Sequence, residues 1–149
     1  MKLGYVSLVV SCGIALAGCA PFAGNGFLRT STTFGTCDDS GVRPCKVQVR
    51  VLPGSKCTLT VTPDWLKVQG KLGVPLPITW ELMTPDYEFP KAVGVIFADP
   101  QFSNQTYDPK SFVVSDGNRT YGWFKYTVNV IGADGLSYCT PLDPWINNY

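Results

Sequence analysis

The chain has no histidine among its 149 residues. This absence excludes the Ser-His-Asp and Cys-His systems that activate a nucleophile. It also excludes zinc, copper and non-haem iron sites with histidine ligands, and it removes the side chain best suited to shuttle protons near neutral pH. Any catalysis would depend on carboxylates, lysine, tyrosine or backbone amides alone. We therefore expect no enzyme, no catalytic residue, no metal site and no cofactor.

Charge is scarce as well. The 12 basic residues and 11 acidic residues together make up only 15% of the chain and nearly cancel. Proteins that bind nucleic acid normally carry a basic stripe that neutralises phosphates, and strong attraction to an anionic membrane surface needs a similar excess. The composition predicts no nucleic-acid partner and no electrostatic steering toward a membrane.

A sustained helical period is also missing after the N-terminal apolar run, and 12 prolines punctuate the chain. Strand patterns are present instead. The run Lys46-Val47-Gln48-Val49-Arg50-Val51 alternates strictly between polar and apolar residues, which is typical of a half-buried strand. The other predicted strands are Cys57–Val61, Trp65–Val68, Ile78–Leu82, Gly94–Phe97, Ser111–Val114, Tyr121–Ile131 and Leu136–Cys139.

Many short strands separated by turn signals indicate an all-β fold, a disulfide-bonded β-sandwich that is immunoglobulin-like or cupredoxin-like in outline. Asp134-Gly135 predicts a hairpin turn, and 116–120 is interpreted as another rather than as a calcium loop, because the later acidic ligand is missing. Trp80 lies in phase with Ile78 and Leu82, so we expect it in the core. The apolar C-terminal tail is expected to fold back over an edge or open end of the sandwich.

The N-terminus carries one specific motif. An apolar run from Leu3 to Leu16 follows Lys2 and ends in Leu16-Ala17-Gly18-Cys19. A basic start, a short apolar core and small residues make a secretory signal. The final four residues resemble the lipobox of bacterial lipoproteins. The resemblance implies that Cys19 begins the mature protein and carries acyl chains that anchor it in a membrane. Ala20, which is not aspartate, resembles the class sorted to the outer membrane, with the domain in the periplasm or at the cell surface.

Two other interpretations of the same segment remain open. Ala15-Leu16-Ala17 fits an ordinary cleavage site, which would release a soluble protein. Alternatively, the stretch from Leu3 to Ala23 is long enough to stay as a spanning helix, since about 20 residues cross a bilayer.

Cysteine parity favours lipidation. Cys12 leaves with the signal and acylation uses Cys19, so an even set remains for an oxidising compartment: Cys37, Cys45, Cys57 and Cys139. We favour the pairs Cys37–Cys45 and Cys57–Cys139, although two other pairings are formally possible. Chain entropy assigns about 2.6 kcal/mol to the short loop and about 4.5 kcal/mol to the long one. The expected organisation is a signal peptide over 1–18, a flexible tether over 19–36 and a β-sandwich domain over 37–149.

Aromatic residues supply the candidate binding site. Trp123 falls on the opposite strand face from Phe124 and Tyr126, so its ring is expected to be exposed, and Tyr121 and Trp145 are further candidates. We expect a membrane-anchored binding or structural module whose partner is another envelope protein. A module that binds carbohydrate or peptidoglycan, with a row of exposed rings, is the alternative, and a histidine-free hydrolase is a third hypothesis.

Overall fold

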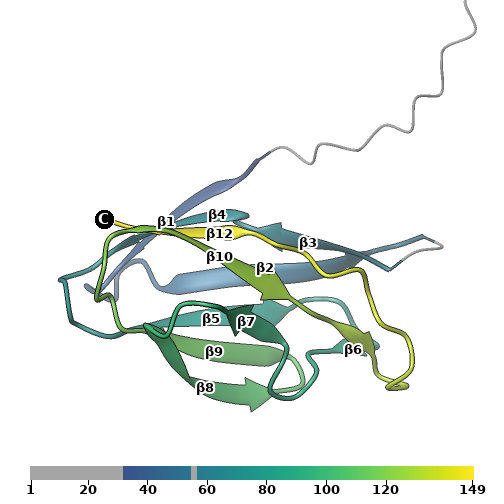
Figure 1. The fold of residues 1–149 in the computed structure, drawn as a ribbon. Helices are drawn as coiled ribbons and strands as arrows, with labels where there is room; N and C mark the ends of the chain where they lie inside the picture. The colour runs from purple at the N-terminus through teal and green to yellow at the C-terminus, as the bar shows by residue number, and fades with distance from the viewer. Residues whose placement is uncertain (1–31, 55–56) are drawn as a thin grey trace, which may run out of the picture.

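The structure is a computed structural model that describes residues 32–54 and 57–149. The described part contains strands and no helix (Figure 1), which confirms the all-β prediction. The strands are β1 (Phe34–Asp38), β2 (Cys45–Leu52), β3 (Thr58–Thr62), β4 (Trp65–Gln69), β5 (Leu76–Leu82), β6 (Tyr87–Glu88), β7 (Val95–Phe97), β8 (Phe102–Asp108), β9 (Ser111–Asp116), β10 (Gly122–Val128), β11 (Ile131–Gly132) and β12 (Trp145–Asn148). Because residues 1–31 lie outside the described part, so do the lipobox and Cys19.

Two five-stranded sheets form a sandwich. The first sheet has the order β1-β4-β12-β10-β7, and the second has the order β3-β2-β5-β9-β8 (Figure 1). A small β11-β6 pair lies beside them. Three neighbouring pairs run parallel, namely β1 with β4, β4 with β12, and β2 with β5. Immunoglobulin sheets are purely antiparallel. The likeness to an immunoglobulin domain is therefore one of outline.

The core follows from the alternation in the strands. In β2 the three valines are buried while Lys46 and Arg50 are exposed, which is the pattern predicted from the sequence. Trp80 is fully buried, as predicted, and its ring meets that of Tyr126 edge to face at 5.3 Å between centroids. These inward faces fill the space between the sheets and leave the two outer faces free for other roles.

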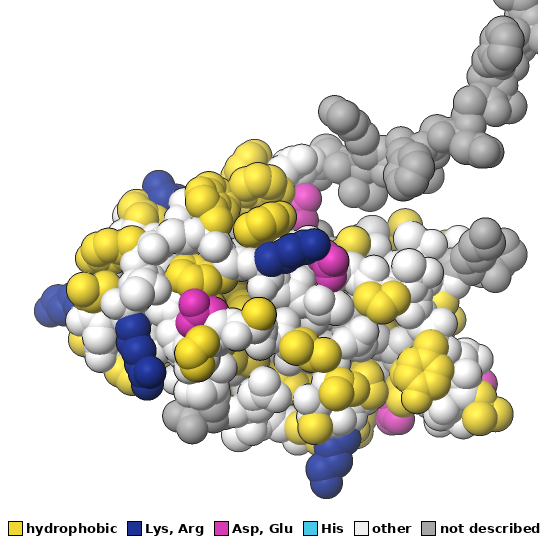
Figure 2. Space-filling model, viewed as in Figure 1, with side chains coloured by type: hydrophobic (Ala, Val, Ile, Leu, Met, Phe, Trp, Pro, Cys, Tyr) yellow, Lys and Arg dark blue, Asp and Glu magenta, His cyan; other side chains and the backbone are white. Residues whose placement is uncertain are grey.

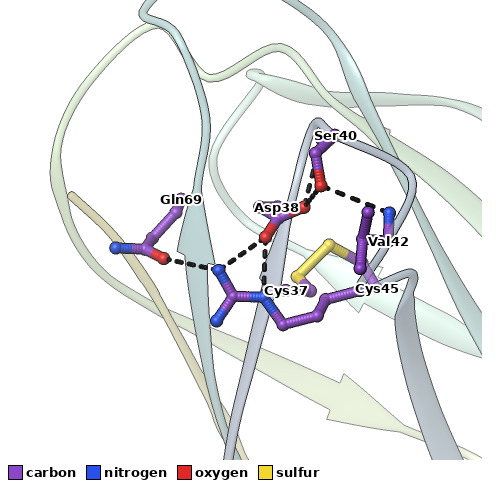
Figure 3. A network of polar contacts seen from close by, with 7 residues as sticks. Cys37, Asp38, Ser40, Val42, Cys45 and Gln69 are labelled. Carbon is purple, nitrogen blue, oxygen red and sulfur yellow. Dashed lines mark hydrogen bonds and ion pairs between the residues drawn. A yellow bond between two sulfur atoms is a disulfide. The ribbon is translucent and has the colours of Figure 1, made fainter.

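Two disulfides tie the sandwich together, with the favoured pairing Cys37–Cys45 and Cys57–Cys139. The first joins β1 of one sheet to β2 of the other. The loop it closes is ordered by a polar network around Asp38, which accepts hydrogen bonds from Ser40 and pairs with Arg43 at 2.6 Å (Figure 3). These contacts, led by the Ser40 hydroxyl, lower the pKa of Asp38 below its ordinary value.

Strand structure is present before residue 37, within the segment expected to be a tether. Strand β1 starts at Phe34, inside the predicted tether, and pairs in parallel with β4. Thr33 is held too, because the Asp64 carboxylate accepts a hydrogen bond from its hydroxyl at 3.0 Å. The segment is rich in Gly, Ser and Thr, which is typical of a flexible linker, so its sequence did not indicate this short strand. The strand is held by partners distant in sequence.

Three local predictions were wrong. The expected single strand over 121–131 is divided into β10 and β11. The Asn129 amide bonds to the Gly94 carbonyl in register with the β10–β7 pairs, but from Ile131 the chain pairs with β6 instead of β7. The turn at Asp134-Gly135 forms, and Asp134 accepts hydrogen bonds from the Leu136 and Ser137 amides. Residues 136–139 then pair with the chain before the turn only through a bridge between Tyr138 and Ile131, so the expected second strand does not form. Residues 116–120 are not a hairpin, because they connect β9 in one sheet to β10 in the other.

The C-terminal tail was also misplaced. It does not cover an edge or open end. Residues Trp145–Asn148 form β12, which lies inside the first sheet between β4 and β10. Ile146 and Asn148 are buried, and the Asn148 amide donates to the buried Asp116 carboxylate at 2.8 Å. The tail therefore belongs to the centre of the fold.

Candidate functional site

The outer face of the first sheet carries an unusual set of side chains. Register places Trp145 of β12 beside Trp65 of β4, and Asn147 between Lys67 and Trp123. Because side chains alternate along each strand, all of these point away from the core. We define the aromatic face as Phe34, Trp65, Trp123, Trp145 and Tyr149.

Three rings of this face contact one another across the sheet. Trp65 and Trp123 lie 4.9 Å apart between centroids at an interplanar angle of 77°, and Phe34 lies 5.9 Å from Trp65 at 48°. The contact between the two tryptophans spans β12, the strand between their own strands. Phe34 is 77% exposed and Trp123 is 52% exposed, which confirms the prediction for Trp123. Tilted rings of this kind attract one another, yet much of their surface still faces water.

A shallow hollow of about 240 Å³ lies among these rings. It is lined by Phe34, Trp65, Leu66, Lys67, Trp123 and Asn147. Sites for drug-sized ligands usually measure about 300–1,000 Å³, so this one suits a single side chain or ring. Its walls are aromatic, and its polar groups are one ammonium and one amide.

A cation lies beside the hollow. The Lys67 ammonium is 3.4 Å from the centroid of the Tyr149 ring, a cation–π contact that holds the end of the chain against the face. Tyr121, the third residue predicted for binding, is 60% exposed and precedes β10. Within the described residues no ring contact joins Tyr121 to the cluster. The structure thus unites Trp123 and Trp145 on one face and leaves Tyr121 at its margin.

The outer face of the second sheet is different in character. Its outward positions are mostly hydroxyl, amide or charged side chains, among them Lys46, Gln48, Arg50, Thr60, Thr79, Glu81 and Ser111. Lys46 and Glu81 form an ion pair there at 2.6 Å. Figure 2 shows hydrophobic side chains at the upper left of the molecule and others spread over its lower and right-hand parts. The two outer faces therefore differ, although both sheets follow the same alternation.

Sequence reasoning missed Phe34 and Trp65 as candidates. Phe34 stands in a segment interpreted as tether, and Trp65 begins a strand whose facing the pattern did not determine. Only the parallel pairing of β1 with β4 and of β4 with β12 brings Phe34 and Trp65 beside the C-terminal strand. These pairs join residues far apart in sequence, so no local pattern indicates them.

No group of three or more histidine, cysteine, aspartate or glutamate side chains in the described residues is arranged to hold a metal ion. A scan against protein-family models finds no match, and a search of curated proteins finds none that is similar. Across residues 32–54 and 57–149 there is no helix of the length and hydrophobicity needed to cross a bilayer.

Proposed function

We propose that the chain is an envelope lipoprotein, anchored through acylated Cys19 in the outer membrane, whose domain binds another protein through the aromatic face. One observation carries the binding proposal: on one outer sheet face Trp65 contacts the exposed rings of Phe34 and Trp123, while the outward positions of the other sheet are mostly polar. Contiguous exposed apolar surface on a soluble domain is typical of an interaction site.

The residue types favour a protein partner. Tryptophan and tyrosine dominate the binding energy of protein interfaces, where they fill or form small desolvated pockets near the centre of the contact. The hollow between Phe34, Trp65 and Trp123 is such a pocket, and Lys67 and Asn147 supply polar groups at its side. A partner side chain inserted there would bury apolar surface on several rings at once.

The ring geometry argues against a sugar-stacking platform. A row of sugar rings lying on a sheet needs aromatic rings in nearly one plane. Here Trp65 and Trp123 stand at 77° to each other, and Phe34 is tilted by 48° from Trp65. Such rings surround a hollow and do not make a flat surface. Binding of carbohydrate or peptidoglycan to this face would therefore contradict the proposal of a protein partner.

The test of the aromatic face uses Phe34→Ala combined with Trp123→Ala. Both side chains are more than half exposed, so the fold should be retained. Loss of a central interface ring typically costs about 2 kcal/mol or more, roughly a 30-fold loss of affinity. We expect affinity purification from crosslinked envelopes to recover one stoichiometric protein with the wild-type chain and at least about tenfold less with the variant.

A matched control uses two residues on the outer face of the second sheet. Gln48→Ala combined with Thr79→Ala should recover the partner as the wild-type chain does. Equal recovery by the aromatic variant would show that the face is not the interface. Sedimentation of the wild-type chain with purified peptidoglycan sacculi, lost on Phe34→Ala and Trp123→Ala, would assign the face to carbohydrate.

The anchor is tested separately by Cys19→Ser. Acyl chains contribute about 0.8 kcal/mol per buried CH₂, so several chains give stable membrane attachment. We expect the variant to appear in the soluble envelope fraction and to lose metabolic labelling with palmitate, while the wild-type chain sediments with outer membranes. Unchanged fractionation of the variant would overturn the lipobox assignment without affecting the aromatic face.

A further inference from the structure

A second concave site lies between the sheets, at the free edge of β3. The segment that leads into β12 is tied to the β3–β4 region at both of its ends. The Thr140 amide donates to the Cys57 carbonyl at 3.1 Å, and the Trp145 amide donates to the Asp64 carbonyl at 3.2 Å. Between these ties the segment turns toward β10, where Leu142 exchanges two hydrogen bonds with Val128. Figure 1 shows this yellow segment passing β3 on its way to β12.

Because this segment turns away from β3, a cleft of about 460 Å³ lies between the two, which we call the β3 cleft. Its floor and one wall come from residues 59–62, and the opposite wall comes from residues 142–145. Thr33, Asp64 and Trp65 close one end. Strands advance about 3.3 Å per residue, so the exposed part of β3 offers a length of about four residues.

Backbone groups in the middle of β3 face this cleft. In β2 the Val49 carbonyl accepts from Met83 and the Val51 amide donates to Thr84, so both residues bond on the β5 side. Register pairs Val49 with Val61, and Val51 with Leu59. In an antiparallel ladder, residues whose partners bond elsewhere form non-hydrogen-bonded pairs. The N–H and C=O groups of Leu59 and Val61 therefore point away from β2. The parallel bridge between Thr58 and Thr140 directs the Leu59 N–H toward the Thr140 carbonyl, so Val61 is the residue that presents both of its backbone groups to the cleft.

The charged side chains that line the cleft are of one sign. Of the described side chains that line it, the charged ones are Asp64 and Asp143, and none is basic. Asp143 is engaged by Lys125 and Thr127, contacts that lower its pKa below the ordinary value, the Lys125 bond first. Asp64 accepts hydrogen bonds from Thr33 through Oδ1, whereas its Oδ2 accepts none from the residues that the structure describes. A cation in the cleft would meet the Asp64 carboxylate first.

We infer that the β3 cleft binds an extended peptide segment of a partner, which adds as a strand to β3 and places a lysine or arginine beside Asp64. Strand addition takes its affinity from backbone hydrogen bonds and its specificity from alternate side chains. Here Val61 provides the backbone N–H and C=O groups, and Asp64 provides the selection for charge. The inference does not depend on the aromatic face, because the cleft uses different walls and shares only Trp65 and Trp145 with it.

The test uses full-length protein in detergent and a defined probe, the capped peptide acetyl-Thr-Val-Arg-Val-Thr-amide. Amide resonances are followed by NMR during titration. We expect the Val61 amide to shift and to become protected from exchange. A peptide methylated on the backbone nitrogens that face β3 should bind at least about tenfold more weakly, since it cannot donate those hydrogen bonds.

Charge selection is tested with Asp64→Asn, which keeps the acceptor for Thr33. The wild-type chain should prefer the arginine peptide over its glutamate counterpart by about tenfold or more, and the variant should lose most of that preference.

Shifts confined to the aromatic face, or no shift at millimolar peptide, would overturn the inference while leaving the proposed function intact. Equal binding of the methylated peptide would also overturn it. Phe34→Ala combined with Trp123→Ala should not alter peptide binding, because neither residue lines the cleft.

Discussion

A chain that ends at Pro144 is expected not to fold. The deleted residues include β12, which pairs at four positions with β4 and at four with β10 in the middle of the first sheet. Its loss would separate β1-β4 from β10-β7 and expose two inner edges. It would also remove the fully buried Ile146 and the partner of the buried Asp116 carboxylate.

The expected size of this effect exceeds the stability of an ordinary domain. Burying one isoleucine contributes about 1.5–3 kcal/mol, and each ladder hydrogen bond contributes about 0.5–1.5 kcal/mol. Summed over the strand, these contributions are comparable with the whole 5–15 kcal/mol net stability of a domain. The measurement is near-UV circular dichroism and the dispersion of the amide NMR spectrum, both of which should resemble those of an unfolded chain.

Removal of Tyr149 alone is the matched control. That residue is exposed and contributes the cation–π contact with Lys67 and one hydrogen bond from its amide to the Val68 carbonyl. Its removal should cost about 1–2 kcal/mol and leave the paired positions of β12 in place. The one-residue deletion should therefore unfold cooperatively at slightly lower denaturant. A dispersed spectrum from the chain ending at Pro144 would contradict the central position of β12.

The parts of the fold that could be predicted are those with a local signal. Strands β2 and β5 alternate between buried and exposed residues along their length, so their sequences indicate both the strand and its inner face. The same alternation located Trp80 in the core and Trp123 outside it. Strand β8 has few apolar residues and an irregular register between Ser103 and Thr106, which explains why its sequence gave no alternating pattern.

The parts that could not be predicted depend on partners far away in sequence. Strand β12 is only four residues long, and its parallel partner Trp65 lies about 80 positions earlier. Residues 116–120 contain turn-forming types whether the chain reverses within a sheet or crosses between sheets. The same limitation applies to the site. Trp123 was identifiable from its phase, whereas its contact with Trp65 required the strand order.

The second large effect concerns the disulfide between Cys57 and Cys139, which closes the sandwich beside the β3 cleft. Near this bridge the described hydrogen bonds that join the two segments include the Thr140 amide to the Cys57 carbonyl at 3.1 Å. A single backbone bond of this kind contributes only about 1 kcal/mol. The covalent link therefore adds a larger constraint at the start of β3 than any one of these backbone bonds.

Replacing this pair by Cys57→Ala and Cys139→Ala is expected to lower the free energy of unfolding by about 4.5 kcal/mol, because the bridge spans 82 positions and constrains the unfolded chain strongly. Urea denaturation of the oxidised proteins measures the change. Cys37→Ala and Cys45→Ala, which open a bridge spanning 8 positions, provide the comparison and should cost about 2.6 kcal/mol. Because β3 would lose its tie to residue 139, the first variant should also weaken the binding of the arginine peptide, while the second should not. If the two variants lost equal stability, loop length would not be the source of the effect, and local packing around each bridge would have to explain it.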